Sequence, residues 1–183
     1  MNTEQLKNHK GDKVVVDNNV LIDLLELSAA LDYNYISILN QLFSKVIIPT
    51  PILEDEYIYD NLSCLNYIEG TLKTNLGFNS YIELANSDDS SAKRLSEYDR
   101  LVISVARERD LLAVSNDKPV REICKKYKIR VTGTLGIIIS AYENQIIEFK
   151  QMEKSFKFLF SDKSSCYLSP SLKTEIYSHY NIK

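Results

Sequence analysis

Short runs of β-branched residues alternate with apolar residues at helical spacing along most of the chain. Such runs, bounded by turn residues, are typical of buried strands, and the intervening spacing is typical of helices. Strands that alternate with helices predict right-handed β–α–β crossovers and a mostly parallel sheet covered on both faces. The sequence therefore predicts an α/β fold, a three-layer α/β/α sandwich.

The expected elements follow from local signals. Strands are expected at Lys13–Asp17, Val46–Ile48, Leu111–Ser115 and Ile129–Thr132. Helices are expected after Asn19, over Tyr35–Phe43, after Pro51, from Ser96 and from Pro119 to about Tyr127. Ser96 followed by Asp99 reads as a variant capping box. From Tyr57 to Asn86 the pattern weakens, and we expect helical pieces joined by loops.

A length of 183 residues favours one domain. After Asn144 a further helical pattern begins, and Ser169 and Pro170 read as the cap and first position of a last helix. We therefore expect residues 1–183 to form a single domain with a C-terminal helical extension at about 145–183. With 44% hydrophobic and 26% charged residues, the composition excludes a disordered chain and a fibre.

The composition also limits the chemistry. No apolar run approaches the length that crosses a bilayer, and the first residues show no apolar signal core, so we expect a cytoplasmic protein without membrane contact. Three cysteines without a CxxC pair suit free thiols. The two histidines, His9 and His179, are poorly placed for a triad or a zinc site. If the protein is an enzyme, we expect carboxylates to do the chemistry.

The net charge is −3, but the charge is unevenly distributed. Between Lys93 and Arg130 there are 11 Lys and Arg and 6 Asp and Glu, a local balance of +5. This asymmetry indicates a basic face; alternatively, the charges coat solvated helices in i,i+4 pairs.

Acidic residues recur where the predicted strands end and helices begin, which is the edge where open α/β sheets bind ligands. They are Asp17, the group Glu54, Asp55 and Glu56, then Asp99, and Asp117. Each alone could cap or flank a helix. Together they would repel one another unless a cation neutralised them, and Mg²⁺ or Mn²⁺ suits an all-oxygen site. Such ions activate water for attack on a phosphodiester, so the pattern indicates a nuclease.

Over most of its length the sequence resembles the PIN-domain ribonucleases. The segments that carry the resemblance are VVVDNNVLIDLL, IIPTPILEDEY and LSEYDRLVISVARERDLLAVSNDKPVR, in that order. GTLGIIISAYENQII from Gly133 and LSPSL from Leu168 are similar to a prokaryotic branch of VapC-like PIN proteins. The resemblance implies a PIN-like fold, an RNA substrate, a toxin role, a homodimer and an inhibitory antitoxin partner.

The resemblance also implies roles for individual residues. Asp17, Asp99 and Asp117 would be the first, third and fourth acids and would hold the metal. Asp55 would be the second acid, where the family usually has Glu, with Glu56 or Glu54 as substitutes. Asn19, Ser115 and Asn116 would give polar support; the family often has Ser or Thr at Asn19, and this branch often has two acids at Asn116–Asp117.

Contacts to RNA are the least specific predictions from the sequence. Arg100, Lys118 and Arg121 are candidates for phosphate contacts, although solvated helix charges explain them as well. Four tyrosines could stack on exposed bases, although half-buried tyrosines usually pack and hydrogen-bond. They are Tyr57, Tyr59, Tyr67 and Tyr81.

Two other functions remain open at this point. A phosphatase of the haloacid dehalogenase kind would use a strand-end Asp as a nucleophile. That chemistry needs a second Asp two residues later, where this chain has Asn19. The other alternative is a binding or regulatory module that no longer cuts, and Asp55 and Asn116 are the departures from the family pattern that favour it.

Overall fold

The computed structural model describes residues 8–54 and 56–182, and its centre is a parallel sheet. Within these residues the sheet has five strands in the order β3-β2-β1-β4-β5. The strands are β1 (Lys13–Val16), β2 (Lys45–Pro49), β3 (Tyr67–Gly70), β4 (Leu112–Val114) and β5 (Val131–Thr132). All four strand pairs are parallel.

The central strand β1 explains why the sheet forms. Val14, Val15 and Val16 are fully buried, because both faces of the strand are covered. Val14 lies beside Val46 of β2 and beside Leu112 of β4. Parallel strands buried on both faces are continuous apolar runs rather than alternating ones, as this segment is.

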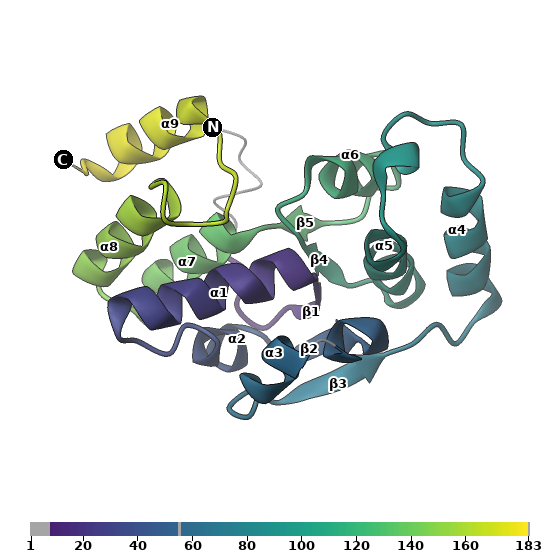
Figure 1. Ribbon diagram of the computed structural model, residues 1–183, viewed down its shortest axis with the longest axis horizontal. Helices are drawn as coiled ribbons and strands as arrows, with labels where there is room; N and C mark the ends of the chain where they lie inside the picture. Colours follow the sequence, from purple (N-terminus) through teal and green to yellow (C-terminus); the bar gives the residue numbers. More distant parts are fainter. Residues whose placement is uncertain (1–7, 55, 183) are drawn as a thin grey trace.

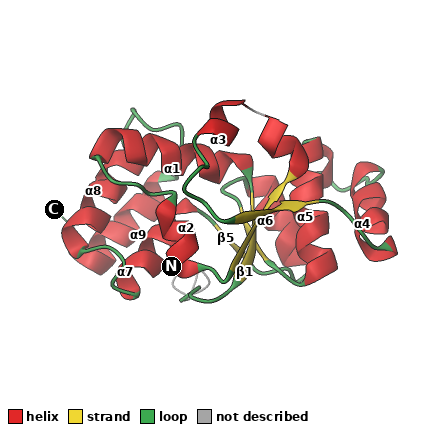
Figure 2. Cartoon of the chain, turned by 90° about the horizontal axis from the view of Figure 1, so that it is seen from below, coloured by secondary structure: helices red, strands yellow, loops and turns green. Residues whose placement is uncertain are grey.

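The helices form two groups, one on each side of the sheet (Figures 1 and 2). One group is α4 (Asn75–Ala85), α5 (Glu97–Arg109) and α6 (Lys118–Lys126), which pack against one another in chain order. The other is α1 (Asn18–Leu31), α2 (Ser37–Leu42), α7 (Thr134–Glu143), α8 (Phe149–Leu159) and α9 (Pro170–Tyr180). The remaining elements among the described residues are short turns of 3₁₀ helix at Thr50–Glu54 and Ala92–Arg94 and helix α3 (Glu56–Asp60). The three-layer prediction is confirmed.

The C-terminal helices pack on the layer that contains α1. Met152, Phe156 and Leu159 of α8 are buried in the same core as the sheet, and α8 contacts both α1 and α7. Helix α9 lies against α7 and α8 through ring contacts of Tyr180 with Tyr142 and Phe156. Ser169 caps α9 through its side chain, and Pro170 is the first helical residue, as predicted.

The prediction for Tyr57–Asn86 was wrong in one part, because this segment contains β3. This strand pairs with β2 in parallel, with Ile68 opposite Ile47. Ile68 and Glu69 are both exposed, so the strand lacks the alternation of buried apolar and exposed polar residues by which a strand is recognised in a sequence. Strand β5 is also shorter than the predicted Ile129–Thr132.

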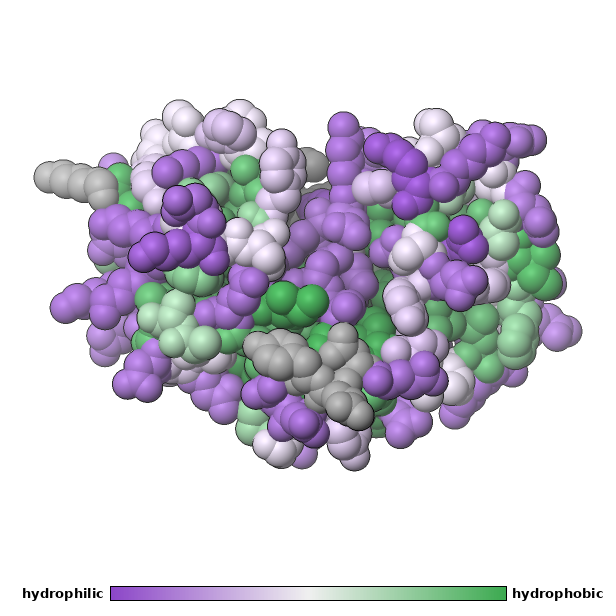
Figure 3. All heavy atoms as spheres, viewed as in Figure 1, coloured by the Kyte–Doolittle hydropathy of each residue, from purple (hydrophilic) through white to green (hydrophobic). Residues whose placement is uncertain are grey.

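The N-termini of three helices meet at the carboxyl edge of the sheet. Asp17 is the N-cap of α1, Ser96 caps α5 and Asp117 is the N-cap residue of α6. Figure 3 shows hydrophilic side chains in a hollow between the two layers, over the N-terminal end of α1. None of the helices described has both the length and the apolar character needed to cross a membrane.

Candidate metal centre

Three carboxyl groups converge at this edge of the sheet. Asp17, Asp99 and Asp117 each offer one oxygen, and the three oxygens lie within 4.8 Å of one another. Asp17 follows β1, and Asp117 follows the neighbouring strand β4 after a two-residue turn, so the parallel pairing of the strands brings them together. Asp99 approaches from the first turn of α5. The sequence prediction that these acids face one edge is confirmed for these three.

The Asp17 carboxylate is held by three donors. Its Oδ1 accepts a hydrogen bond from the backbone N–H of Asn18 at 2.8 Å. Its Oδ2 accepts from Asn19 Nδ2 at 2.8 Å and from Ser115 Oγ at 2.6 Å. Asp17 is 2% exposed. These contacts fix the orientation of a carboxyl group that water barely reaches.

Asn19 and Ser115 connect Asp17 to the turn that carries Asp117. Ser115 Oγ accepts from the backbone N–H of Asp117 at 3.2 Å. Asn19 Oδ1 accepts from the backbone N–H of Asn116 at 3.2 Å. Both residues therefore lie where the sequence placed polar support for the acids.

Asp99 is positioned by the capping box of α5. Its Oδ2 accepts from the backbone N–H of Ser96 at 2.7 Å, and Ser96 Oγ accepts from the backbone N–H of Asp99 at 3.1 Å. This pair satisfies two N–H groups that the start of a helix leaves unbonded. The same contacts aim the Asp99 carboxyl group, which is 8% exposed, toward Asp17.

The electrostatics of the cluster favour a bound cation. The pKa of Asp17 is raised to about 7, mainly by burial and also by the nearby charges of Asp99 and Asp117, against the opposing hydrogen bonds from Ser115 and Asn18. Burial, followed by the charge of Asp99, also raises the pKa of Asp117. Carboxylates gathered in this way hold protons unless a cation compensates their charge. An all-oxygen donor set of this kind fits a hard divalent ion.

The predicted second acid falls at the edge of the described part of the chain. Asp55 lies outside the described residues, and the side chains of Glu56 and Tyr57 are not described either. Glu54 is exposed at the end of the 3₁₀ turn after β2, and it is not a member of the three-acid cluster.

The predicted RNA-contacting residues fall in different places. Lys118 and Arg121 line a cavity beside the acids, and Arg121 also donates to the backbone carbonyl of Ser115 at 3.2 Å. Arg100 donates instead to the backbone carbonyl of Leu95 at 3.0 Å and does not line this cavity. Tyr59, which is exposed, and the half-buried Tyr67 and Tyr81 lie outside it as well.

A second polar cluster behind the acids escaped the sequence analysis. Asp23 on α1 is 2% exposed, and its Oδ2 accepts from Asn116 Nδ2 and from Thr134 Oγ1, both at 2.6 Å. Burial raises its pKa, while hydrogen bonds from Thr134, Cys166 and Asn116 oppose the rise. We expected the side chain of Asn116 to support the three clustered acids, but it donates to Asp23 instead. One signal was present in the sequence, because Asp23 falls on the apolar stripe of α1.

The comparison with known families agrees with this geometry. The model of the DUF3368 family, described as a PIN domain, matches residues 13–181. The chain belongs to the PIN-domain family. The match includes all three clustered acids of this PIN domain and extends through α8 and α9. No curated protein and no solved structure gives a significant match.

Proposed function

We propose that this PIN domain is an endoribonuclease that needs Mg²⁺ or Mn²⁺ and hydrolyses RNA phosphodiester bonds at Asp17, Asp99 and Asp117. The observation that carries the proposal is the approach of these three carboxylates to within 4.8 Å at the carboxyl edge of the sheet. Membership of the PIN-domain family, whose members are in general nucleases, supports it.

In this proposal the acidic residues of the site hold the metal ion and orient the attacking water. A bound divalent ion would lower the pKa of a water molecule and offset the charge of the phosphate. Asp17, held by Ser115 and Asn19, would keep its oxygens fixed toward the ion. Asp99 and Asp117 would complete the carboxylate ligands from α5 and α6. Asp55, or Glu56 or Glu54 in its place, would add the second acid of the family pattern and orient the attacking water.

The finer roles rest on the resemblance of the sequence to the VapC-like branch. We propose on that basis that the protein is the toxin of a toxin–antitoxin pair in the cytoplasm, that it forms a homodimer, and that a small antitoxin inhibits it. Copurification of this chain with the product of an adjacent small gene, and loss of RNA cleavage in that complex, would support this role. Full cleavage activity in the presence of the neighbouring product would contradict it.

Cleavage of RNA by the purified protein tests the activity. A mixed RNA pool is incubated with the protein and Mn²⁺, Mg²⁺ or EDTA, with Asp17→Asn and Asp162→Asn purified in the same way. Asp162 is exposed and distant in sequence from the cluster, so its variant controls for purification and for loss of a surface charge. We expect metal-dependent fragments from the wild type and Asp162→Asn, and none from Asp17→Asn. Equal cutting by Asp17→Asn would contradict the mechanism.

The alternative of a binding module that no longer cuts is supported by Asn116, whose side chain donates to Asp23 and adds no carboxylate to the cluster. Calorimetric titration with Mn²⁺ separates the two functions. A nuclease centre should bind the ion with millimolar or better affinity and lose that binding in Asp17→Asn, whereas an inert module should bind none. The phosphatase alternative fits less well, because Asn19 donates to Asp17 where a second Asp would be needed.

A further inference from the structure

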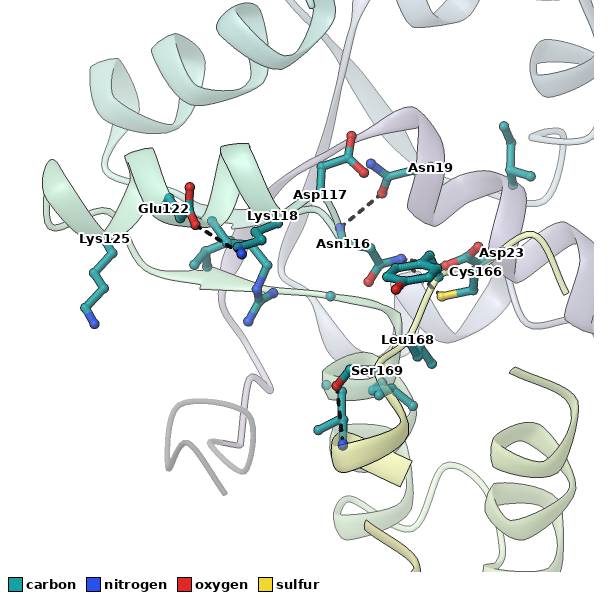
Figure 4. A pocket seen from close by; sticks show the side chains of 18 of the residues that line it. Asn19, Asp23, Asn116, Asp117, Lys118, Glu122, Lys125, Cys166, Leu168 and Ser169 are labelled. Carbon is teal, nitrogen blue, oxygen red and sulfur yellow. Dashed lines mark hydrogen bonds and ion pairs between the residues drawn. The ribbon is translucent and has the colours of Figure 1, made fainter. Parts of the chain in front are cut away.

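A cavity of about 870 Å³ adjoins the acidic cluster (Figure 4). One wall is formed by α6 and β5, and the other by α1 and a segment that we call the C-terminal strap, Ser165–Ser169. Asp117 of the acidic cluster lines the cavity, and so does Asn19, which donates to Asp17, so the cavity and the cluster are continuous. The volume lies within the range of about 300–1,000 Å³ that is usual for small-molecule sites.

The α6–β5 wall is rich in cations. Lys118, Lys125, Lys128 and Arg130 line it together with Arg121. Several other cationic residues between Lys93 and Arg130 form ion pairs with acidic residues, among them Arg94 with Glu122 and Lys126 with Asp89. Within residues 8–54 and 56–182, Lys125 and Lys128 have no ion-pair partner, and both are exposed. Figure 4 shows Lys118 and Lys125 on α6, across from Cys166, Leu168 and Ser169.

The opposite wall presents an uncovered aromatic ring on a fixed backbone. Tyr167 lines the cavity and is 90% exposed. The strap that carries it is held at several points: Ser165 N–H donates to Glu26 at 2.9 Å, the Cys166 side chain is buried near Asn116, and Ser169 caps α9. In the described part of the chain, no other ring contacts that of Tyr167.

We propose that this cavity binds the unpaired nucleotides that flank the scissile phosphodiester. Lys125 and Lys128 contact their phosphates, and Tyr167 stacks on a base. An aromatic ring opposite a cationic wall is the arrangement that binds single strands, because every base has a face that can stack. Double-stranded RNA keeps its bases stacked on each other and offers none to Tyr167. The inference rests on the proposed function for the position of the cut, but its test does not depend on cleavage.

Binding is measured by fluorescence anisotropy with a labelled single-stranded RNA of mixed sequence and the full chain in EDTA, which stops metal-dependent cleavage. We expect Tyr167→Ala to weaken binding at least about fivefold, and Tyr167→Phe, which keeps the ring, to retain it. The matched control is Phe78→Ala, which removes a ring that is 51% exposed on α4, outside the cavity. Its affinity should equal that of the wild type.

The lysines are tested through salt dependence. Lys125→Gln and Lys128→Gln should each weaken binding and reduce the slope of log affinity against log salt by about 1, because each phosphate contact releases a counterion. Lys154→Gln on α8, an exposed lysine outside the cavity, should leave the slope unchanged.

Three outcomes would overturn the proposal. The first is unchanged RNA affinity in Tyr167→Ala and in both lysine variants. The second is equal competition by a duplex of the same sequence, which would show that unpaired bases are not needed. The third is equal competition by polyglutamate, which would indicate a general site for anionic polymers. Any of these results together with metal-dependent cleavage lost in Asp17→Asn would leave the nuclease function standing.

Discussion

At the scale of single residues, Asp17 combines burial with charge. It is 2% exposed and lies beside two further carboxyl groups, yet three hydrogen bonds favour its ionised form. The outcome is a pKa raised from 3.8 to about 7. Without a cation the folded protein thus retains a proton that the unfolded chain releases, and the site destabilises the metal-free fold at neutral pH.

The first prediction concerns the pH dependence that follows from Asp17. In EDTA its contribution to the free energy of unfolding should be complete below about pH 4 and fall as the pH rises toward about 7, because only the unfolded chain ionises in that window. In Asp17→Asn this fall should be smaller by on the order of 3 kcal/mol. Urea unfolding at pH 4, 5.5 and 7.5 measures the difference.

The control for this prediction is Asp162→Asn, an exposed surface change whose stability should stay within about 0.5 kcal/mol of wild type at each pH. Mn²⁺ should restore stability at pH 7.5 in the wild type but not in Asp17→Asn, since a ligand stabilises only the state that binds it. Identical pH profiles for the wild type and Asp17→Asn would disprove the prediction.

The second prediction concerns Thr134, whose hydroxyl donates to Asp23 and accepts from Asn116 at 2.8 Å. Thr134→Val keeps the shape of the side chain but leaves the buried Asp23 with one hydrogen-bond donor fewer. This should lower the free energy of unfolding by about 1–3 kcal/mol. The loss of that donor raises the Asp23 pKa further, so the cost should be larger at pH 8 than at pH 5. Urea midpoints at the two pH values check both the size and the sign.

A matched threonine lies two residues away. Thr132 is equally buried, and its hydroxyl has no hydrogen-bond partner among the described residues, so Thr132→Val should cost little. If the two variants lost the same stability, the prediction that the hydrogen bond to Asp23 stabilises the fold would be wrong.

At the scale of elements, the start of α5 both caps a helix and positions an acid. The Ser96–Asp99 capping box satisfies the first turn and turns Asp99 toward the cluster. Ser96→Ala should therefore destabilise the fold by about 1 kcal/mol and also weaken Mn²⁺ binding. Thermal unfolding in EDTA and calorimetric titration measure the two effects, and Ser96→Thr, which can still cap, should show neither. A stability loss with unchanged Mn²⁺ affinity would mean that packing alone positions Asp99.

The elements that were predictable from the sequence are those whose local pattern matches their final environment. Strand β1 is an uninterrupted valine run because both its faces are buried, and Ser96 is a cap whose partner lies three residues away. Strand β3 was not predictable from local sequence. It forms because it pairs with β2 in the folded protein, and its exposed Ile68 and Glu69 show no alternation of buried and exposed residues. Local sequence carries little information about an edge strand that has one neighbour.

The same contrast applies to the site. Asp17 and Asp117 were predictable because they follow adjacent parallel strands, whose ends must meet. The cluster around Asp23 was not, because Asn116, Thr134 and Cys166 come from separate parts of the chain and approach Asp23 only in three dimensions. Sequence distance conceals contacts that depend on how the helices cross.

At the scale of the whole molecule, the C-terminal helices share a core with the sheet. Phe156 of α8 is fully buried in the cluster that also contains β1. We expect residues 8–182 to unfold as one cooperative unit, in keeping with the prediction of a single domain. Phe156→Ala should lower the free energy of unfolding by about 3–5 kcal/mol.

Hydrogen exchange distinguishes a shared core from a separate subdomain. Amides of β1 and α8 should lose protection together in Phe156→Ala. The control Phe149→Ala removes a ring that is 40% exposed on the same helix, so it should change the protection of β1 and of α8 little. Loss of protection confined to α8 and α9 would show that the C-terminal helices unfold independently.

The exposed ring of Tyr167 has a practical consequence for spectroscopy. The chain contains 12 tyrosines but no tryptophan, so its intrinsic emission carries no indole signal. Tyr167→Trp would introduce a single indole at the mouth of the cavity, on a backbone that is held on both sides. Its emission would start from that of a solvated indole and change when anything covers the ring. Occupancy of the cavity would then be observable in real time with unlabelled ligands.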